Sequence, residues 1–395
     1  MSSFHISISA TALSALKSRL ELTTFPDELD DAGWGYGVPL ADIKRLVARW
    51  RDGFDWRKAE QQLNALPQFT RDIEVDGFGV LNIHYVHKKS EKGQGLPLLS
   101  DCISIGPGGF FEAQKIIPLL TKVHEGSELP TFDVVALSLP GYGFSEGPKK
   151  KGFSIMQYAE VAHKLMLALG YNEYVTQGGD WGSTITRQIA YTYGGKYSKA
   201  WHTNFLLTSP PPDDESSKYS PVDKEGLERF KNFDQFGSGY FIQQSTKPQT
   251  LGYSLADSPV GLLAWIYEKL VGWTDSYPWT DDEVLTWVSI YWFSRSGPAA
   301  SIRIYYEAMR TRQEVGDTPP SSIPLGTSNF PKELGRIPKS WYPHVGNVVF
   351  EAEHNVGGHF AALEQPEQLV ADLQQMFGKG GSAYGVVPGR DGYGT

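Results

Sequence analysis

The spacing of apolar positions predicts where the chain is helical and where it forms strands. Residues 1–75 are polar with widely spaced aromatic residues, a pattern that favours helices. Asp55 precedes a run of helix formers there, as at a capped helix start. From residue 79 on, short β-rich apolar runs take turns with amphipathic stretches. This alternation predicts βαβ units and an α/β fold, with a mostly parallel sheet covered by helices on both faces.

The same pattern divides the chain into segments. The alternation stops near residue 209 at a run of prolines, and residues 209–328 are almost wholly of helical type before sheet-like runs return at 346–350. We therefore expect a helical lid inserted into an α/β core. The expected segments are an N-terminal arm over 1–75, a core over 76–208 and 329–377, the lid over 209–328 and a Gly-rich, mobile tail over 378–395.

Composition narrows the class of protein. A chain of 395 residues exceeds the roughly 250–300 residues that one hydrophobic core supports, which agrees with a main domain plus a lid or arm. The net charge of -9 argues against nucleic acid and anionic membranes as partners. A single cysteine, Cys102, excludes a disulfide framework and fits a reducing compartment. No apolar run could span a membrane and no signal peptide is expected, so the sequence predicts a soluble, cytoplasmic protein.

The most informative segment is a predicted strand at 174–176 that runs into the residues GGDWGS at 178–183 and then into a helix-compatible stretch. A strand–turn–helix with small residues around its central residue is typical of a nucleophile turn, with Asp180 where a serine hydrolase has Ser. A carboxylate there would attack an sp3 carbon and form an ester. The other interpretation is an ordinary Asp at a helix start. The serine-hydrolase-like GFSEG at 143–147 lacks a following helix, so we discard Ser145 as nucleophile.

Further motifs are PGYGFS at 140–145 and GGHFAALE at 357–364, and the arm contains DWR at 55–57, LNALPQF at 63–69 and IHYVH at 83–87. With GGDWGS, these segments resemble the microsomal-type epoxide hydrolases of the α/β-hydrolase superfamily, in a soluble, fungal-like form. The resemblance covers about residues 4–377. Its long arm is the specific part, since simple α/β hydrolases and haloalkane dehalogenases lack it. It implies the α/β-hydrolase fold and an enzyme that opens a small-molecule epoxide to a vicinal diol without metal or organic cofactor.

The resemblance also implies which residues complete the reaction. His359, which follows the predicted strand 346–350 in chain order and lies in a Gly-rich loop, would be the base, with His354 as its nearest rival. NFPKEL at 329–334 aligns Glu333 with the acid that orients the base, and Glu353 is the alternative. His84 and His87 fall on opposite faces of a strand, so no metal pair is expected.

Two lid tyrosines would donate hydrogen bonds to the epoxide oxygen in this family. The segments QSTKPQT at 244–250 and SIRIYYE at 301–307 align with its lid motifs. They assign the two roles to Tyr240 and Tyr305, with Tyr253 and Tyr306 as the neighbours that could replace them.

The oxyanion hole for ester hydrolysis would use the backbone N–H groups of Trp181 and Gly106. Family members usually have His-Gly-Trp-Pro where this chain has SIGP at 104–107. Loss of the Trp predicts a wider pocket and a bulky substrate, such as an epoxide of secondary metabolism. It also predicts that ester hydrolysis is the step most affected.

Two other functions stay open from the sequence. An Asp-Trp-Gly turn with a later His also serves in dehalogenases, which would need halide-binding Trp or Asn groups in place of two lid tyrosines. A ligand-binding homologue, or a cyclase that opens an epoxide without water attack, is the third interpretation. The resemblance further brings an expectation of a homodimer and of a role in detoxification.

Overall fold

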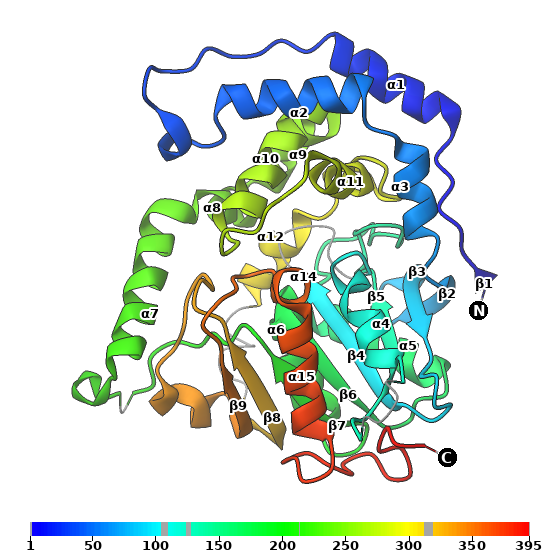
Figure 1. The fold of residues 1–395 in the computed structure, drawn as a ribbon, viewed down its shortest axis with the longest axis vertical. Coiled ribbons are helices and arrows are strands. Elements are labelled where there is room, and N and C mark those ends of the chain that lie inside the picture. Colours follow the sequence, from blue (N-terminus) through cyan, green and yellow to red (C-terminus); the bar gives the residue numbers. More distant parts are fainter. Residues whose placement is uncertain (1, 104–109, 124–127, 213, 312–318, 395) are drawn as a thin grey trace.

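The computed structural model describes residues 2–103, 110–123, 128–212, 214–311 and 319–394. Within these residues the centre of the fold is a nine-stranded sheet of order β1-β2-β3-β5-β4-β6-β7-β8-β9 (Figure 1). Its strands are β1 (Ser2–Ser3), β2 (Gln68–Val75), β3 (Gly79–Lys88), β4 (Leu96–Ile103), β5 (Phe132–Leu137), β6 (Tyr174–Asp180), β7 (Ser198–Thr203), β8 (Ser321–Asn329) and β9 (Gly346–Glu353).

The pairing within the sheet changes along its width. Strands β1, β2, β3 and β5 pair antiparallel, whereas every pair from β5 through β4 and β6 to β9 is parallel. The mostly parallel sheet predicted from the sequence is therefore confirmed. Strand β4 lies between β5 and β6, so the chain changes direction across the sheet at this point. In parallel sheets, ligands bind beyond the carboxyl ends of the strands at such a switch.

Helices cover both faces of the sheet, as predicted. Helices α5 and α6 pack together on one face, and α4 and α15 pack together on the other (Figure 1). All six side chains of β5 are buried between these layers, which explains why five of its six residues are apolar. The helices of this part are α4 (Ile116–Thr121), α5 (Ile155–Ala168), α6 (Trp181–Tyr193), α14 (Ala361–Glu364) and α15 (Pro366–Phe377).

A second group of helices forms the lid beyond the carboxyl ends of the strands (Figure 1). They are α7 (Pro221–Asn232), α8 (Gly239–Thr246), α9 (Pro248–Asp257), α10 (Pro259–Gly272), α11 (Asp281–Trp292) and α12 (Arg303–Arg310). The predicted lid extends too far, because residues 321–328 lie in strand β8 between β7 and β9. No helix within the described ranges is both long and apolar enough to cross a bilayer.

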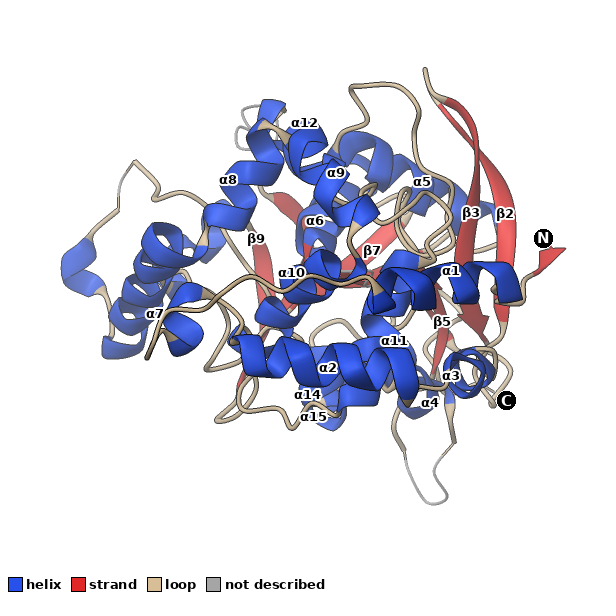
Figure 2. Cartoon of the chain, turned by 90° about the horizontal axis from the view of Figure 1, so that it is seen from above, coloured by secondary structure: helices blue, strands red, loops and turns tan. Residues whose placement is uncertain are grey.

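The N-terminal arm lies over the lid (Figure 2). It contains α1 (Ala10–Glu21), α2 (Leu40–Asp52) and α3 (Trp56–Leu63), and α2 packs on α10 and α11. The predicted capped start of α3 is confirmed, since the Asp55 carboxylate accepts the N–H groups of Arg57 and Lys58. The arm is not helical throughout, however. Residues 68–75 form strand β2, because Ile73 and Val75 alternate with polar residues and are buried by the sheet.

Single helical turns complete the secondary structure of the described residues. The 3₁₀ turns are Gly33–Tyr36, Glu112–Gln114, Ser216–Lys218 and Lys339–His344, and a π-helical turn covers Phe233–Gly237.

The tail after residue 377 is docked, which corrects the expectation of a mobile end. Ala383 and Val387 are buried against the main core. The guanidinium of Arg390 lies 2.6 Å from the buried carboxylate of Asp133 on β5. The tail is polar and rich in glycine, but these contacts with residues distant in sequence hold it on the domain.

Candidate active site

Asp180 lies at the turn between β6 and α6. Its backbone has φ 48° and ψ −122°, a conformation that is costly for a residue with a side chain. The turn is also very tight, because a Cβ atom on Gly178 would lie 2.4 Å from the carbonyl oxygen of Gly182. The strand–Asp–helix pattern therefore holds one carboxylate in a strained position at the carboxyl edge of the sheet.

The structure brings together the three residues that the sequence analysis assigned as nucleophile, base and orienting acid. His359, in the loop between β9 and α14, has its Nε2 atom 2.9 Å from Oδ2 of Asp180. Its Nδ1 atom is 2.5 Å from Oε1 of Glu333, which follows β8. Asp180 is 9% exposed, His359 is 2% exposed and Glu333 is 4% exposed. They form a buried array in which the imidazole of His359 lies between the carboxyl groups of Asp180 and Glu333.

The two alternative residues have other partners. The carboxylate of Glu353 forms an ion pair with Arg336, with both oxygens 2.7 Å from the guanidinium. The Nε2 atom of His354 lies 2.7 Å from Oδ2 of Asp372. Both residues are therefore engaged outside the Asp180 array.

The charge state of His359 follows from its two carboxylate neighbours. Burial favours the neutral imidazole, but the charge of Glu333 and the hydrogen bond that His359 donates to Asp180 outweigh it and raise the pKa of His359 to about 10. This direction favours a protonated imidazole between Asp180 and Glu333 in the resting array. Removal of either negative charge would lower the pKa of His359 towards neutrality.

Tyr240 on α8 and Tyr305 on α12 lie side by side next to this array. Their ring centroids are 6.1 Å apart, and the ring of Tyr305 meets that of Trp181 edge to face at 4.9 Å. The Tyr305 hydroxyl is buried, and hydrogen bonds from the side chains of Trp181 and Gln244 oppose part of the rise in its pKa. Burial and the nearby charge of Asp180 raise the pKa of both hydroxyls well above 10. Both phenols therefore stay protonated at neutral pH and can donate.

The two neighbouring tyrosines point elsewhere. Tyr253 is 71% exposed. The guanidinium of Arg310 covers the ring of Tyr306, with 3.3 Å between the guanidinium carbon and the ring centroid. Tyr253 and Tyr306 line an outer groove instead.

One of the two expected oxyanion donors is in contact with the carboxylate. The backbone N–H of Trp181 donates to Oδ1 of Asp180 at 2.6 Å. Gly106 and the rest of the segment 104–107 lie outside the described residues. The N–H of Trp181 thus already meets the oxygen that would be the carbonyl oxygen of an ester on Oδ2.

Sequence reasoning missed the aromatic residues that enclose the imidazole. Its ring contacts Trp273 at 5.0 Å and both Phe205 and Phe360 at 5.4 Å, all close to perpendicular. The only advance signal was the aromatic content of 13%, which does not mark individual residues. These rings shield the array from bulk water, which strengthens its charge interactions.

A second acid, Glu364, was present in a quoted motif but received no role. Its carboxylate accepts the N–H of Asp275 at 2.7 Å and that of Phe360 at 3.0 Å. Burial raises its pKa to about 7. The carboxylate of Asp275 in turn accepts the N–H of Gly357 at 2.9 Å. Glu364 and Asp275 thus join the lid to the loop that carries His359.

The hydrogen bonds of Ser145, His84 and His87 hold the fold together rather than form a site. The hydroxyl of Ser145 donates to the carbonyl of Ser138 and accepts the N–H of His84, so it closes a buried turn. The ring of His84 contacts Ser138 and Gln68, whereas that of His87 contacts Tyr171. Within the described ranges, His, Cys, Asp and Glu side chains form no cluster suited to a metal ion.

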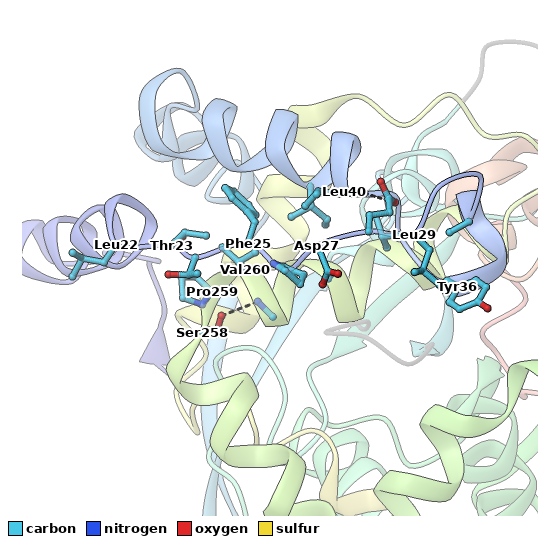
Figure 3. Close-up of a pocket in the computed structure, with 18 of the residues that line it drawn as sticks. Leu22, Thr23, Phe25, Asp27, Leu29, Tyr36, Leu40, Ser258, Pro259 and Val260 are labelled. Carbon is cyan, nitrogen blue, oxygen red and sulfur yellow. Dashed lines mark hydrogen bonds between the residues drawn. The ribbon is translucent and has the colours of Figure 1, made fainter.

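A groove of about 770 Å³ lies apart from the array, between the α1–α2 connection and the start of α10 (Figure 3). Its apolar lining includes Leu29, Leu40 and Val260. Neither Asp180 nor His359 lines it. The groove therefore belongs to the seam between arm and lid.

The chain is similar to known proteins over most of its length. Residues 1–112 match the family model described as epoxide hydrolase N terminus, and residues 106–239 match that of the alpha/beta hydrolase fold. A protein of Stigmatella aurantiaca is 39% identical over 386 residues, which cover 95% of this chain and 84% of that protein. Epoxide hydrolase 1 of Sus scrofa is 34% identical over an alignment of 415 residues, which covers 95% of this chain and 88% of that protein. The structure of Aspergillus niger epoxide hydrolase superposes with a TM-score of 0.83 at 35% identity, over 94% of each chain.

Proposed function

The chain belongs to the epoxide hydrolase family and has the α/β-hydrolase fold, and on this premise we propose that it opens an epoxide through a covalent ester on Asp180. The observation that carries the proposal is the continuous array from Glu333 through His359 to Asp180, with contacts of 2.5 and 2.9 Å. A carboxylate on a strained turn, next to a buried imidazole, is suited to attack first and be hydrolysed afterwards.

In the first step a carboxylate oxygen of Asp180 attacks a carbon of the epoxide ring. The new C–O ester bond forms while the ring C–O bond breaks, and the electron pair of that bond passes to the epoxide oxygen. The hydroxyls of Tyr240 and Tyr305 donate hydrogen bonds to this oxygen and supply the proton it needs. Their raised pKa values support this role, because both keep their protons until the alkoxide develops.

In the second step His359 acts as the base. Ester formation removes the negative charge of Asp180, and with it one of the two interactions that hold the pKa of His359 at about 10. The imidazolium then gives up its proton, which restores the tyrosine that protonated the epoxide oxygen. The neutral imidazole accepts a proton from a water molecule, whose oxygen adds to the carbonyl carbon of the ester. The N–H of Trp181, and by our proposal that of Gly106, stabilise the oxyanion. Collapse of the oxyanion breaks the ester C–O bond, and the departing oxygen takes its proton from His359. The vicinal diol is released and the Asp180 carboxylate is restored.

For the substrate we propose a bulky epoxide. Two features support a bulky substrate: Gly106 stands where the family usually has Trp, and aromatic rings surround His359. Comparable or better turnover of small aryl epoxides than of bulky ones would contradict this part of the proposal.

The experiment that tests the mechanism is intact-protein mass spectrometry of His359→Gln after mixing with a panel of epoxides of different size. We expect a mass increase equal to one substrate, because the ester forms and is not hydrolysed. Asp180→Asn is the control and should show no adduct. An adduct on Asp180→Asn, or none on His359→Gln with any epoxide, would overturn the covalent mechanism.

A further inference from the structure

Lys269 in helix α10 places a buried ammonium group beside the candidate active site. Its side chain is only 6% exposed. It forms an ion pair with Glu268, whose side chain is 44% exposed and therefore partly solvated. Burying a charge is costly unless its surroundings compensate for it. An apolar side chain of the same length would occupy this position without that cost, so the charge needs a reason.

Three aromatic rings surround the ammonium. The Nζ atom of Lys269 lies 4.8 Å from the ring centroid of Tyr240, 5.9 Å from that of Trp273 and 6.0 Å from that of Trp265. All three distances are in the range of attraction between a cation and a ring face, and the attraction is strongest where water is excluded. Tyr240 is the nearest of the three. Lys269 therefore acts most directly on a residue that we place at the epoxide.

Tyr240 needs such a partner. Burial and the charge of Asp180 both raise the pKa of its hydroxyl and make it a weaker donor. Its ring also packs between Trp273 and Tyr305, with centroid distances of 5.4 and 6.1 Å. A cation over the ring opposes the effect of Asp180, and it holds the ring at a fixed distance from α10.

We propose that Lys269 is a positioning residue for ring opening, which fixes the ring of Tyr240 and strengthens its O–H as donor to the epoxide oxygen. The inference rests on the proposed role of Tyr240. As the ring opens, negative charge develops on the epoxide oxygen and is shared with the phenol. The ammonium then stabilises this state more than the starting state, which is the condition for a faster step.

The test compares the rate of ester formation with styrene oxide in single-turnover mixtures, followed by rapid quenching and intact-protein mass spectrometry. Lys269→Met removes the charge at nearly constant length and Lys269→Arg keeps the charge. Lys269→Gln is a second uncharged variant in case Lys269→Met does not fold. Lys44→Met is the matched control, because Nζ of Lys44 lies 5.8 Å from the ring of Phe25 in the arm, away from Asp180.

We expect Lys269→Met to slow ester formation about tenfold, to leave ester hydrolysis unchanged, and to be rescued largely by Lys269→Arg. Combined with Tyr240→Phe, it should cause no further loss, because its target hydroxyl is absent. Three results would overturn the inference. Lys269→Met could slow ester formation equally with and without the Tyr240 hydroxyl, it could slow ester formation and ester hydrolysis equally, or it could slow neither step.

Failure of the proposed function has a different result. If Tyr240→Phe forms the ester at the unmodified rate, the role of Tyr240 falls and the inference with it. If styrene oxide and trans-stilbene oxide both leave the unmodified chain and His359→Gln without an adduct, the covalent mechanism itself falls. If Lys269→Met forms the ester slowly while the unmodified chain still forms it on Asp180, both the covalent mechanism and the inference about Lys269 are supported.

Discussion

The carbonyl oxygen of Trp273, at the end of lid helix α10, accepts the backbone N–H of His359 at 2.9 Å. The same Trp ring lies 5.0 Å from the imidazole. The lid is therefore attached directly to the loop of the base. A displacement of the end of α10 would be transmitted to the imidazole and to its contact with Asp180, so variants at this attachment should affect catalysis without touching the substrate.

Glu364→Gln tests this attachment. The carboxylate accepts two N–H groups, one on each oxygen, whereas an amide can accept on its oxygen alone. One buried N–H then faces an NH₂ group, and we expect a loss of about 1–3 kcal/mol in the free energy of unfolding. Ester hydrolysis should slow as well, because His359 loses its fixed position. Urea unfolding and single-turnover kinetics measure the two effects; a normal hydrolysis rate in the destabilised variant would show that the attachment is only structural.

Glu333→Gln should leave an enzyme that accumulates the ester. The amide lacks the negative charge that stabilises the imidazolium and selects its tautomer, so we expect ester hydrolysis to slow about 100-fold or more. Glu353→Gln is the matched control, because that carboxylate pairs with Arg336 on the surface side and should leave turnover nearly unchanged. The steady-state fraction of alkylated enzyme, read by mass, decides between them. Accumulation in Glu353→Gln instead would reassign the orienting acid.

Gly178→Ala should unfold the turn that presents Asp180. Its Cβ would lie 2.4 Å from the carbonyl oxygen of Gly182, a backbone atom that cannot move without displacing α6. We expect a destabilisation of about 3 kcal/mol, together with loss of ester formation. Gly272→Ala at the end of α10 is the control, because its Cβ meets nothing within 4 Å and its stability should stay within about 0.5 kcal/mol. Thermal unfolding of the pair measures the difference.

The parts of this structure that the sequence predicted are those whose residues carry a local pattern. The run 132–137 is apolar except for Asp133 and forms β5, and the glycines around Asp180 indicated a tight turn. Strand β8 was missed because its residues, SSIPLGTSN, are typical of loops. The sheet decided its conformation, since β7 and β9 pair with it on both sides.

The same distinction between local patterns and long-range contacts explains which residues of the candidate site could be predicted. Asp180, His359 and Glu333 lie in recognisable motifs, so pattern and resemblance found them. Lys269 does not, since the ring of Tyr240 that it covers lies 29 positions earlier, on another helix. In the sequence, a lysine with no charge motif around it resembles a solvated residue. Its burial among Tyr240, Trp265 and Trp273 is seen only in the folded chain.

Arg390→Met tests whether the docked tail contributes to stability. The substitution leaves the carboxylate of Asp133 buried without its guanidinium partner, although Ser90 and Tyr171 still donate to it. We expect a loss of about 2–3 kcal/mol, below the full cost of an unpaired buried charge. Arg51→Met is the control. Its partner Asp52 is exposed, so the free energy of unfolding should stay close to that of the unmodified chain. Equal effects in the two variants would mean that the tail contact contributes nothing specific.

His359 should make the stability of the protein fall at alkaline pH. Its pKa rises from 6.5 in the unfolded chain to about 10 in the folded one, so the folded state binds this proton more tightly between those values. The contribution is fully present below pH 6.5 and is lost as the pH rises through about 10. Urea unfolding at pH 7 and pH 10 should therefore show a smaller loss of free energy for His359→Gln than for the unmodified chain. Tyrosines titrate in the same range in both proteins, so the difference between them isolates His359. An identical loss in both would mean that the imidazole is neutral in the resting array and that ester formation is not needed to free it as a base.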